Sequence, residues 1–234
     1  MDKWQINAAK KMTDFLQDVF KVEKVEVYGS VLDWELLDVF SDVDMNVFLQ
    51  KDVEFNSQEF INVASEKFGI LGYQVHKHEG RDLFRLCFEN GWRFDISFFY
   101  QKVKECPMAE SFECSVDSLV KDFWFCASMV LTKLGRGDYL IASHLALGLC
   151  QQIIVLQMIV RDYKKGTHIH RFGDKENVPV FDGLFSATCE GDAKSKILNM
   201  LFVAAEQMDK AAMELSERYT CKTHKLKAIQ VIGE

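Results

Sequence analysis

The sequence predicts an α+β protein in two parts, a mixed sheet flanked by helices and then an α-helical bundle. Apolar residues alternate with period two in several stretches before residue 100, as in half-buried strands. Beyond Cys106-Pro107 the apolar period becomes helical, and strand patterns cease. We therefore expect domains at 1–106 and 107–234.

The expected elements follow this pattern in order. Apolar spacing predicts a helix over Trp4 to Val19, and Ser57 is a candidate cap for a helix that runs to Phe68. The predicted strands of the first part lie around Val25–Val27, Val43–Leu49, Tyr73–Val75 and Phe84–Phe88, with a hairpin across Leu86–Tyr100. In the second part helices are predicted over Ser118–Leu134, from Asp138 or Tyr139 to about Tyr163, and over Lys194–Tyr219.

Apolar residues are almost continuous from Leu140 to Val160, which predicts a central helix of the bundle. No strictly apolar run reaches the ~18 residues of a membrane span, and the N-terminus does not resemble a signal peptide. The 7 cysteines have no metal-ligand spacing. We expect them to be reduced thiols in a cytoplasmic protein without a membrane partner.

The net charge of −7 bears on the partners of the protein. Proteins that grip a nucleic-acid backbone usually carry a basic stripe, because phosphate contacts dominate their affinity. Here the basic residues are dispersed, apart from Arg161–Lys165 and Lys222–Lys227. The composition therefore disfavours a nucleic-acid partner and suits a cationic small molecule.

Three aspartates are the candidate catalytic residues. Asp42 and Asp44 lie two apart at the start of a predicted strand, so period two directs both carboxylates to one face. Two such carboxylates repel each other and call for a cation, for which Mg2+ is suited. Asp95 lies in an apolar strand after the expected Asn90-Gly91 turn. Its charge needs a partner, and sharing a metal ion with Asp42 and Asp44 is the partner that we favour.

Gly29 and Ser30 end the strand before these aspartates. Glycine lets the backbone approach an anion closely, and the serine hydroxyl adds a hydrogen-bond donor for a phosphate oxygen. Each piece alone is commonplace, since Gly-Ser is most often a turn and Asp-x-Asp is most often solvated. Their combination in this order is much rarer, and it predicts a metal-nucleotide site.

These motifs resemble the active site of the polymerase β-like nucleotidyltransferase superfamily. Phe88-Glu-Asn-Gly-Trp-Arg-Phe-Asp-Ile-Ser97 is similar to aminoglycoside 6-adenylyltransferases, and Tyr28-Gly-Ser with Ser41-Asp-Val-Asp is similar to lincosamide nucleotidyltransferases. The segment from Lys133 to Leu145 extends the resemblance. The resemblance implies a nucleotidyltransferase domain and a helical acceptor-binding domain.

The resemblance also implies the chemistry. A nucleoside monophosphate, AMP from ATP, would pass to a hydroxyl of a small molecule, and pyrophosphate would leave. Asp42 and Asp44 would hold Mg2+, while Asp95 would join a second Mg2+ and help to take the hydroxyl proton. Gly29 and Ser30 would position the β- and γ-phosphates, and Lys133 and Arg136 would face the triphosphate. The alternative for these two basic residues is interaction with the helix C-terminus alone.

Several alternatives remain open at this point. The acceptor hydroxyl could belong to a protein, as in a toxin-neutralising pair, instead of an antibiotic. A polymerase-like enzyme and a non-catalytic binding module that kept the fold are the other two rivals. The resemblance also leaves open which nucleotide is used and whether the site belongs to one chain or to a homodimer.

Overall fold

The computed structural model describes residues 3–32, 37–103, 112–166 and 192–232. The chain divides into two compact units, residues 1–111 and 112–232. The predicted boundary at Cys106-Pro107 lies outside the described residues.

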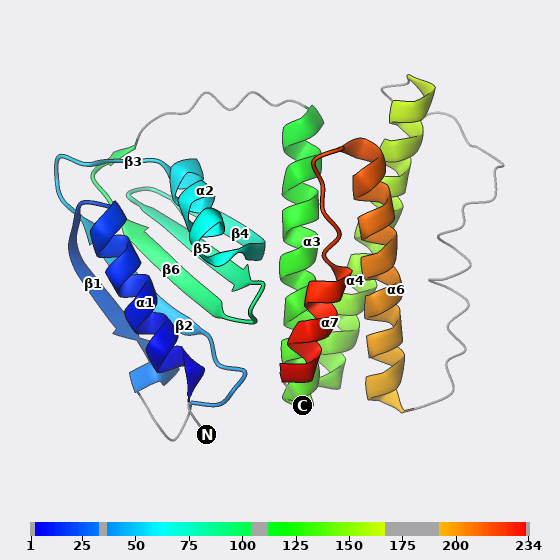
Figure 1. Ribbon diagram of the computed structural model, residues 1–234, viewed down its shortest axis with the longest axis horizontal. Coiled ribbons are helices and arrows are strands. Elements are labelled where there is room, and N and C mark those ends of the chain that lie inside the picture. The colour runs from blue at the N-terminus through cyan, green and yellow to red at the C-terminus, as the bar shows by residue number, and fades with distance from the viewer. Residues whose placement is uncertain (1–2, 33–36, 104–111, 167–191, 233–234) are drawn as a thin grey trace. The chain divides into compact units, whose positions relative to one another are not determined.

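The first unit is an α/β layer built on a mixed sheet (Figure 1). The order of the five strands is β1-β2-β6-β5-β4, in which β2 and β6 are parallel and the other neighbours are antiparallel. The strands are β1 (Val22–Tyr28), β2 (Val43–Leu49), β4 (Ile70–His78), β5 (Arg81–Phe88) and β6 (Arg93–Phe99). Two short strands, β3 (Glu54–Phe55) and β7 (Lys102–Val103), form a separate parallel pair.

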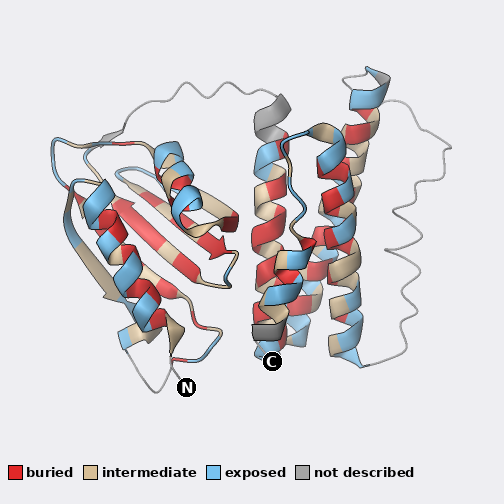
Figure 2. Cartoon of the chain, in the orientation of Figure 1, coloured by how far each residue is buried: buried red, intermediate tan, exposed pale blue. Residues whose placement is uncertain are grey.

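Both helices of this unit, α1 (Trp4–Val19) and α2 (Ser57–Phe68), cover the same face of the sheet (Figure 1). Apolar side chains from α1, from α2 and from alternate strand positions form one buried core, drawn in red in Figure 2. Because strand side chains alternate between faces, the residues between the core positions are directed to the opposite face. That face carries the polar residues of the candidate site.

The predicted bounds of α1, β2 and α2 agree with the structure. The cap of α2 differs, because the Asn56 side chain accepts hydrogen bonds from the backbone N–H groups of Gln58 and Glu59, while Ser57 is the first helical residue. Gly69 ends α2 with a left-handed φ of 71°, a conformation that glycine adopts without steric cost.

The second unit is helical. Its helices are α3 (Phe112–Gly135), α4 (Tyr139–Lys165), α6 (Ala193–Leu215) and α7 (Thr223–Ile232). In Figure 1, α3 runs opposite to α4, whereas α4 and α6 run in the same direction. Helix α3 begins six residues before the predicted Ser118. Asp138 is the N-cap of α4, where its side chain accepts a hydrogen bond from the Ile141 N–H.

The prediction that α4 is a central helix of the bundle agrees with its packing against both α3 and α6, but its nearly continuous apolar run is not buried all round. Leu140 is 87% exposed and Leu147 is 54% exposed, so one face packs in the bundle and another faces solvent. By length and composition alone α4 could cross a membrane, but core helices of soluble proteins pass the same test. Only 33% of the most apolar 18-residue stretch of α4 is buried.

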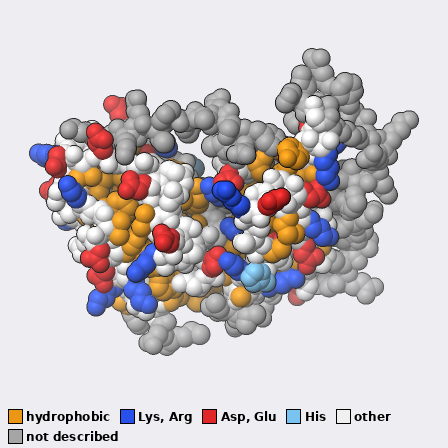
Figure 3. Space-filling model, turned by 45° about the horizontal axis from the view of Figure 1, so that its top comes forward, with side chains coloured by type: hydrophobic (Ala, Val, Ile, Leu, Met, Phe, Trp, Pro, Cys, Tyr) orange, Lys and Arg blue, Asp and Glu red, His pale blue; other side chains and the backbone are white. Residues whose placement is uncertain are grey.

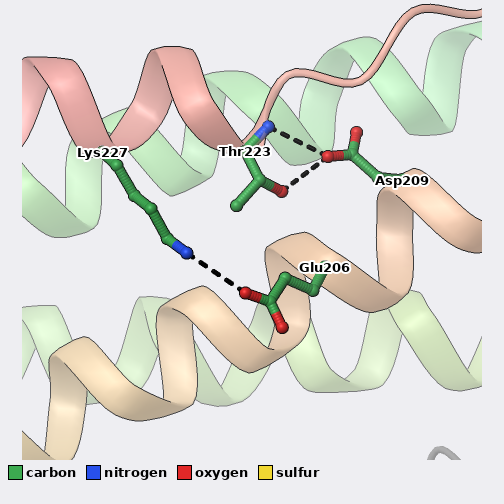
Figure 4. A network of polar contacts seen from close by, with 4 residues as sticks. All are labelled: Glu206, Asp209, Thr223 and Lys227. Carbon is green, nitrogen blue, oxygen red and sulfur yellow. Dashed lines mark hydrogen bonds and ion pairs between the residues drawn. The ribbon is translucent and has the colours of Figure 1, made fainter.

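The single helix predicted to Tyr219 is also incorrect, because α6 ends at Leu215 and a further helix, α7, follows. Asp209 of α6 holds the start of α7 in place. Its buried carboxylate accepts hydrogen bonds from the Thr223 backbone and hydroxyl at 2.9 and 2.6 Å, as drawn in Figure 4. It also accepts from the Lys222 N–H and the Tyr219 hydroxyl, at 2.9 and 2.7 Å. Asp209 therefore caps α7 from a neighbouring helix.

We predict that Asp209→Ala destabilises the helical unit by about 2 kcal/mol or more, because it leaves several donors without their charged acceptor. The matched control is Glu206→Ala, one turn away, which removes a half-exposed ion pair with Lys227 at 3.1 Å. Exposed pairs contribute about 0–1 kcal/mol. Urea unfolding measures both free energies, and equal losses in the two variants would refute the capping role.

Candidate active site

Two of the three aspartates lie side by side on the sheet. Asp44 of β2 pairs in register with Asp95 of β6, and these strands are parallel neighbours. Paired residues face the same side of a sheet, so both carboxylates lie on the face opposite α1 and α2. Asp42 precedes β2 by one residue, and Tyr28 of β1 pairs with Asp44 on its other side.

The charges of these carboxylates interact. Burial, and then repulsion from Asp42 and Asp95, raises the pKa of Asp44 to about 6, against a partly offsetting effect of Arg85. Burial also raises the pKa of Asp95, although the Arg85 guanidinium counteracts it. The negative charge on this face is therefore costly in the absence of a bound cation, as the Asp-x-Asp spacing predicts.

The partner of Asp95 in the structure is Arg85 of β5. The Arg85 Nε lies 3.1 Å from one Asp95 carboxylate oxygen and 3.4 Å from the other, and the two residues pair across β5 and β6. The sequence predicted a shared metal ion as the partner instead. Arg85 is thus a site residue that the sequence pattern does not predict.

The sequence pattern does not predict Arg85 as the partner of Asp95 because the hairpin turn is longer than the expected Asn90-Gly91 turn. The Phe88 N–H donates to the Trp92 carbonyl, so three residues, Glu89 to Gly91, form the loop, and Gly91 has a φ of 84°. An Asn-Gly turn of two residues would place Leu86 opposite Asp95. The three-residue loop, a common hairpin form with glycine in the left-handed region, shifts the register by one and brings in Arg85.

Gly29 supports the proposed phosphate-binding turn. It has a left-handed φ of 72° and begins a short 3-10 helix, Gly29–Leu32, directly after β1. A Cβ atom at this position would overlap the Asp44 carboxylate in its present position, and the positive φ itself favours glycine. Ser30, half-buried in the same turn, lies next to this close approach.

The donor set fits Mg2+ with few protein ligands. Within the described parts of the chain, no three His, Cys, Asp or Glu side chains form a ready-made metal site. Mg2+ commonly binds one or two carboxylates and completes its shell with water and substrate phosphates. Asp42 and Asp44, which repel each other beside Gly29, match that requirement, whereas Asp95 is engaged by Arg85.

Lys133 and Arg136 belong to the second unit. Lys133 lies in the last turn of α3, which suits an interaction with the helix C-terminus. Arg136 is exposed just beyond that helix. Binding of either residue to phosphate stays a prediction, because the carboxylates belong to the first unit.

Comparison with known proteins gives one solved structure of interest. The chain is similar to an aminoglycoside 6-adenyltransferase from Bacillus subtilis, over 96% of each chain, with a TM-score of 0.37 and 11% sequence identity. That protein belongs to the class of enzyme that the sequence motifs resemble. No family model and no curated protein matches the chain.

We predict that Asp44→Asn stabilises the metal-free protein at pH 7.5. The pKa of Asp44 is raised in the folded state, so its charged form opposes folding above about pH 6. Removing the charge contributes on the order of 1 kcal/mol after allowance for solvent screening.

The stabilisation by Asp44→Asn should depend on pH. Protonation of wild-type Asp44 below about pH 6 favours the folded state, so the difference in melting temperature between the proteins narrows toward pH 5. Calorimetry in EDTA measures it. A variant less stable than wild type at pH 7.5 would contradict the raised pKa.

Proposed function

We propose that this protein is a Mg2+-dependent nucleotidyltransferase that transfers AMP from ATP to a hydroxyl of a small molecule. The main support is the pairing of Asp44 with Asp95 on one sheet face, next to the close contact of Gly29 with Asp44. This arrangement places paired carboxylates beside a turn suited to phosphate. The resemblance of the sequence motifs to nucleotidyltransferases supports the same reaction.

In this proposal Asp42 and Asp44 hold the metal ion, which neutralises charge on the triphosphate when bound. Gly29 and Ser30 position the β- and γ-phosphates through the backbone and the serine hydroxyl. The acceptor oxygen bonds to the α-phosphorus, the bond from that phosphorus to the bridging oxygen breaks, and pyrophosphate leaves. Positioning and charge neutralisation account for most of the rate of such transfers.

Asp95 is the proposed acceptor of the hydroxyl proton. Its ion pair with Arg85 keeps the carboxylate oriented, and burial keeps its pKa above the usual aspartate value. Both properties suit a general base. This role agrees better with the engaged carboxylate than the second-metal role predicted from the sequence.

The acceptor that we propose is a cationic small molecule, such as an aminoglycoside, with a lincosamide as the second choice. The net charge of −7 supports a cationic acceptor. Within each unit, on the side drawn in Figure 3, the described basic side chains are interspersed with acidic ones and form no continuous stripe. That pattern disfavours a nucleic-acid acceptor. The described cysteines Cys87, Cys126, Cys150 and Cys221 form no disulfide with one another, which is compatible with the cytoplasmic location that we propose.

Pyrophosphate release tests this function directly. We expect release with ATP and Mg2+ to require one compound from a panel of aminoglycosides and lincosamides, and to fall at least ~100-fold in Asp42→Asn, because the metal loses a charged ligand. GTP, CTP and UTP in parallel reveal the nucleotide preference.

Each other outcome has its own meaning. Nucleotide binding without release on any compound would redirect the search to a protein hydroxyl. Absence of nucleotide binding would contradict the enzyme proposal. Undiminished release by Asp42→Asn would refute the metal site.

Arg85 gives a second prediction. Because its guanidinium lowers the pKa of Asp95, Arg85→Met should move the acidic limb of the pH–rate profile to higher pH. The control is Arg81→Met on the same strand, where the guanidinium lies over the Phe99 ring. Arg81→Met should have the wild-type pH–rate profile. If Arg85→Met has that profile too, Asp95 is excluded as the titrating base.

A further inference from the structure

The segment that leads into the aspartates, residues 38–41, is held by side chains from elsewhere in the unit. Each of its four backbone carbonyls accepts a hydrogen bond from a side chain of α1 or β6. Gln5 Nε2 donates to the Asp38 and Ser41 carbonyls, at 2.6 and 3.2 Å. Trp4 Nε1 donates to the Val39 carbonyl at 3.1 Å.

Arg93 completes this set from the start of β6. Its guanidinium donates to the Phe40 carbonyl, and Arg93 precedes Asp95 by two residues on the same strand. The segment also closes on itself, because the Asp38 carboxylate accepts from the Phe40 N–H and the Ser41 hydroxyl, at 2.8 and 2.9 Å. The segment that precedes Asp42 is therefore held by hydrogen bonds from both α1 and β6.

Gln5 is an unusual residue for a purely structural role. Its side chain is fully buried at 0% exposure, and its Oε1 has no hydrogen-bond partner among the described residues. A buried polar atom without a partner is costly. An apolar residue of the same size would avoid that cost, so the amide is best explained by the two carbonyls to which it donates.

We infer that Gln5 is a positioning residue of the active site, which acts through residues 38–41 to fix the carboxylate of Asp42. This inference rests on the proposed function, in which Asp42 and Asp44 hold the metal ion. Groups that orient metal ligands commonly alter metal affinity about 10–100-fold when they are removed. Trp4 and Arg93 assist by holding the two carbonyls between those bound by Gln5.

The test is a titration with Mn2+ in the presence of a non-hydrolysable ATP analogue, in which electron paramagnetic resonance measures the bound Mn2+. Gln5→Met keeps the size of the side chain and removes its donors. We expect its Mn2+ affinity to fall about tenfold, with cooperative unfolding retained. The rate of pyrophosphate release by Gln5→Met should recover at saturating metal. A loss of folded protein would instead lower this rate at every metal concentration.

The matched control is Gln58→Met. Gln58 also donates a hydrogen bond from a helix of this unit, to Asn62 at 2.9 Å. Among the described residues, its hydrogen bonds are with Asn56 and Asn62, not with residues 38–41. It should bind Mn2+ as wild type does. Trp4→Phe, which removes the donor to Val39 and keeps an aromatic ring beside Trp92, serves as the second variant if Gln5→Met does not fold, and should weaken binding in the same direction.

Asp42→Asn in the same titration separates the two hypotheses. If Asp42→Asn weakens Mn2+ binding but Gln5→Met and Trp4→Phe bind as wild type does, the positioning role is overturned and the proposed function stands. If Asp42→Asn binds Mn2+ with wild-type affinity, the metal site fails, and the positioning role fails with it.

Discussion

Asp44 and Asp95 lie in register on adjacent parallel strands, and the repulsion among their charges constrains the rest of the first unit. Burial and neighbouring carboxylates raise the pKa of Asp44 to about 6, so the metal-free site opposes folding near neutral pH. The apolar core on the other face of the sheet must stabilise the fold against this cost. Strongly shifted pKa values of this kind cluster at functional sites.

The residues around Asp44 and Asp95 accommodate the repulsion between these carboxylates. Arg85 partly neutralises Asp95 and orients it, while Gly29 leaves room for the Asp44 carboxylate at the end of β1. Gln5 holds the segment before Asp42 from the helix side. Helix α1, whose apolar residues pack in the core, thus also positions the backbone of the site.

The sequence predicted what depends on local pattern. The bounds of α1, β2 and α2 follow from apolar period and agree with the structure, as does the α+β class. Helix α7 was missed because its start depends on a cap from Asp209 in another helix. Arg85 was missed because one extra loop residue sets the hairpin register. Both depend on contacts that no local window contains.

A crystal structure with Mn2+ and a non-hydrolysable ATP analogue is the decisive test of the metal site, because anomalous scattering locates the metal without assumptions about the acceptor. We expect a Mn2+ ion bound by Asp42 and Asp44, with the β- and γ-phosphates against Gly29 and Ser30. Density for nucleotide or metal away from this sheet face, with Asp42 and Asp44 unliganded, would contradict it.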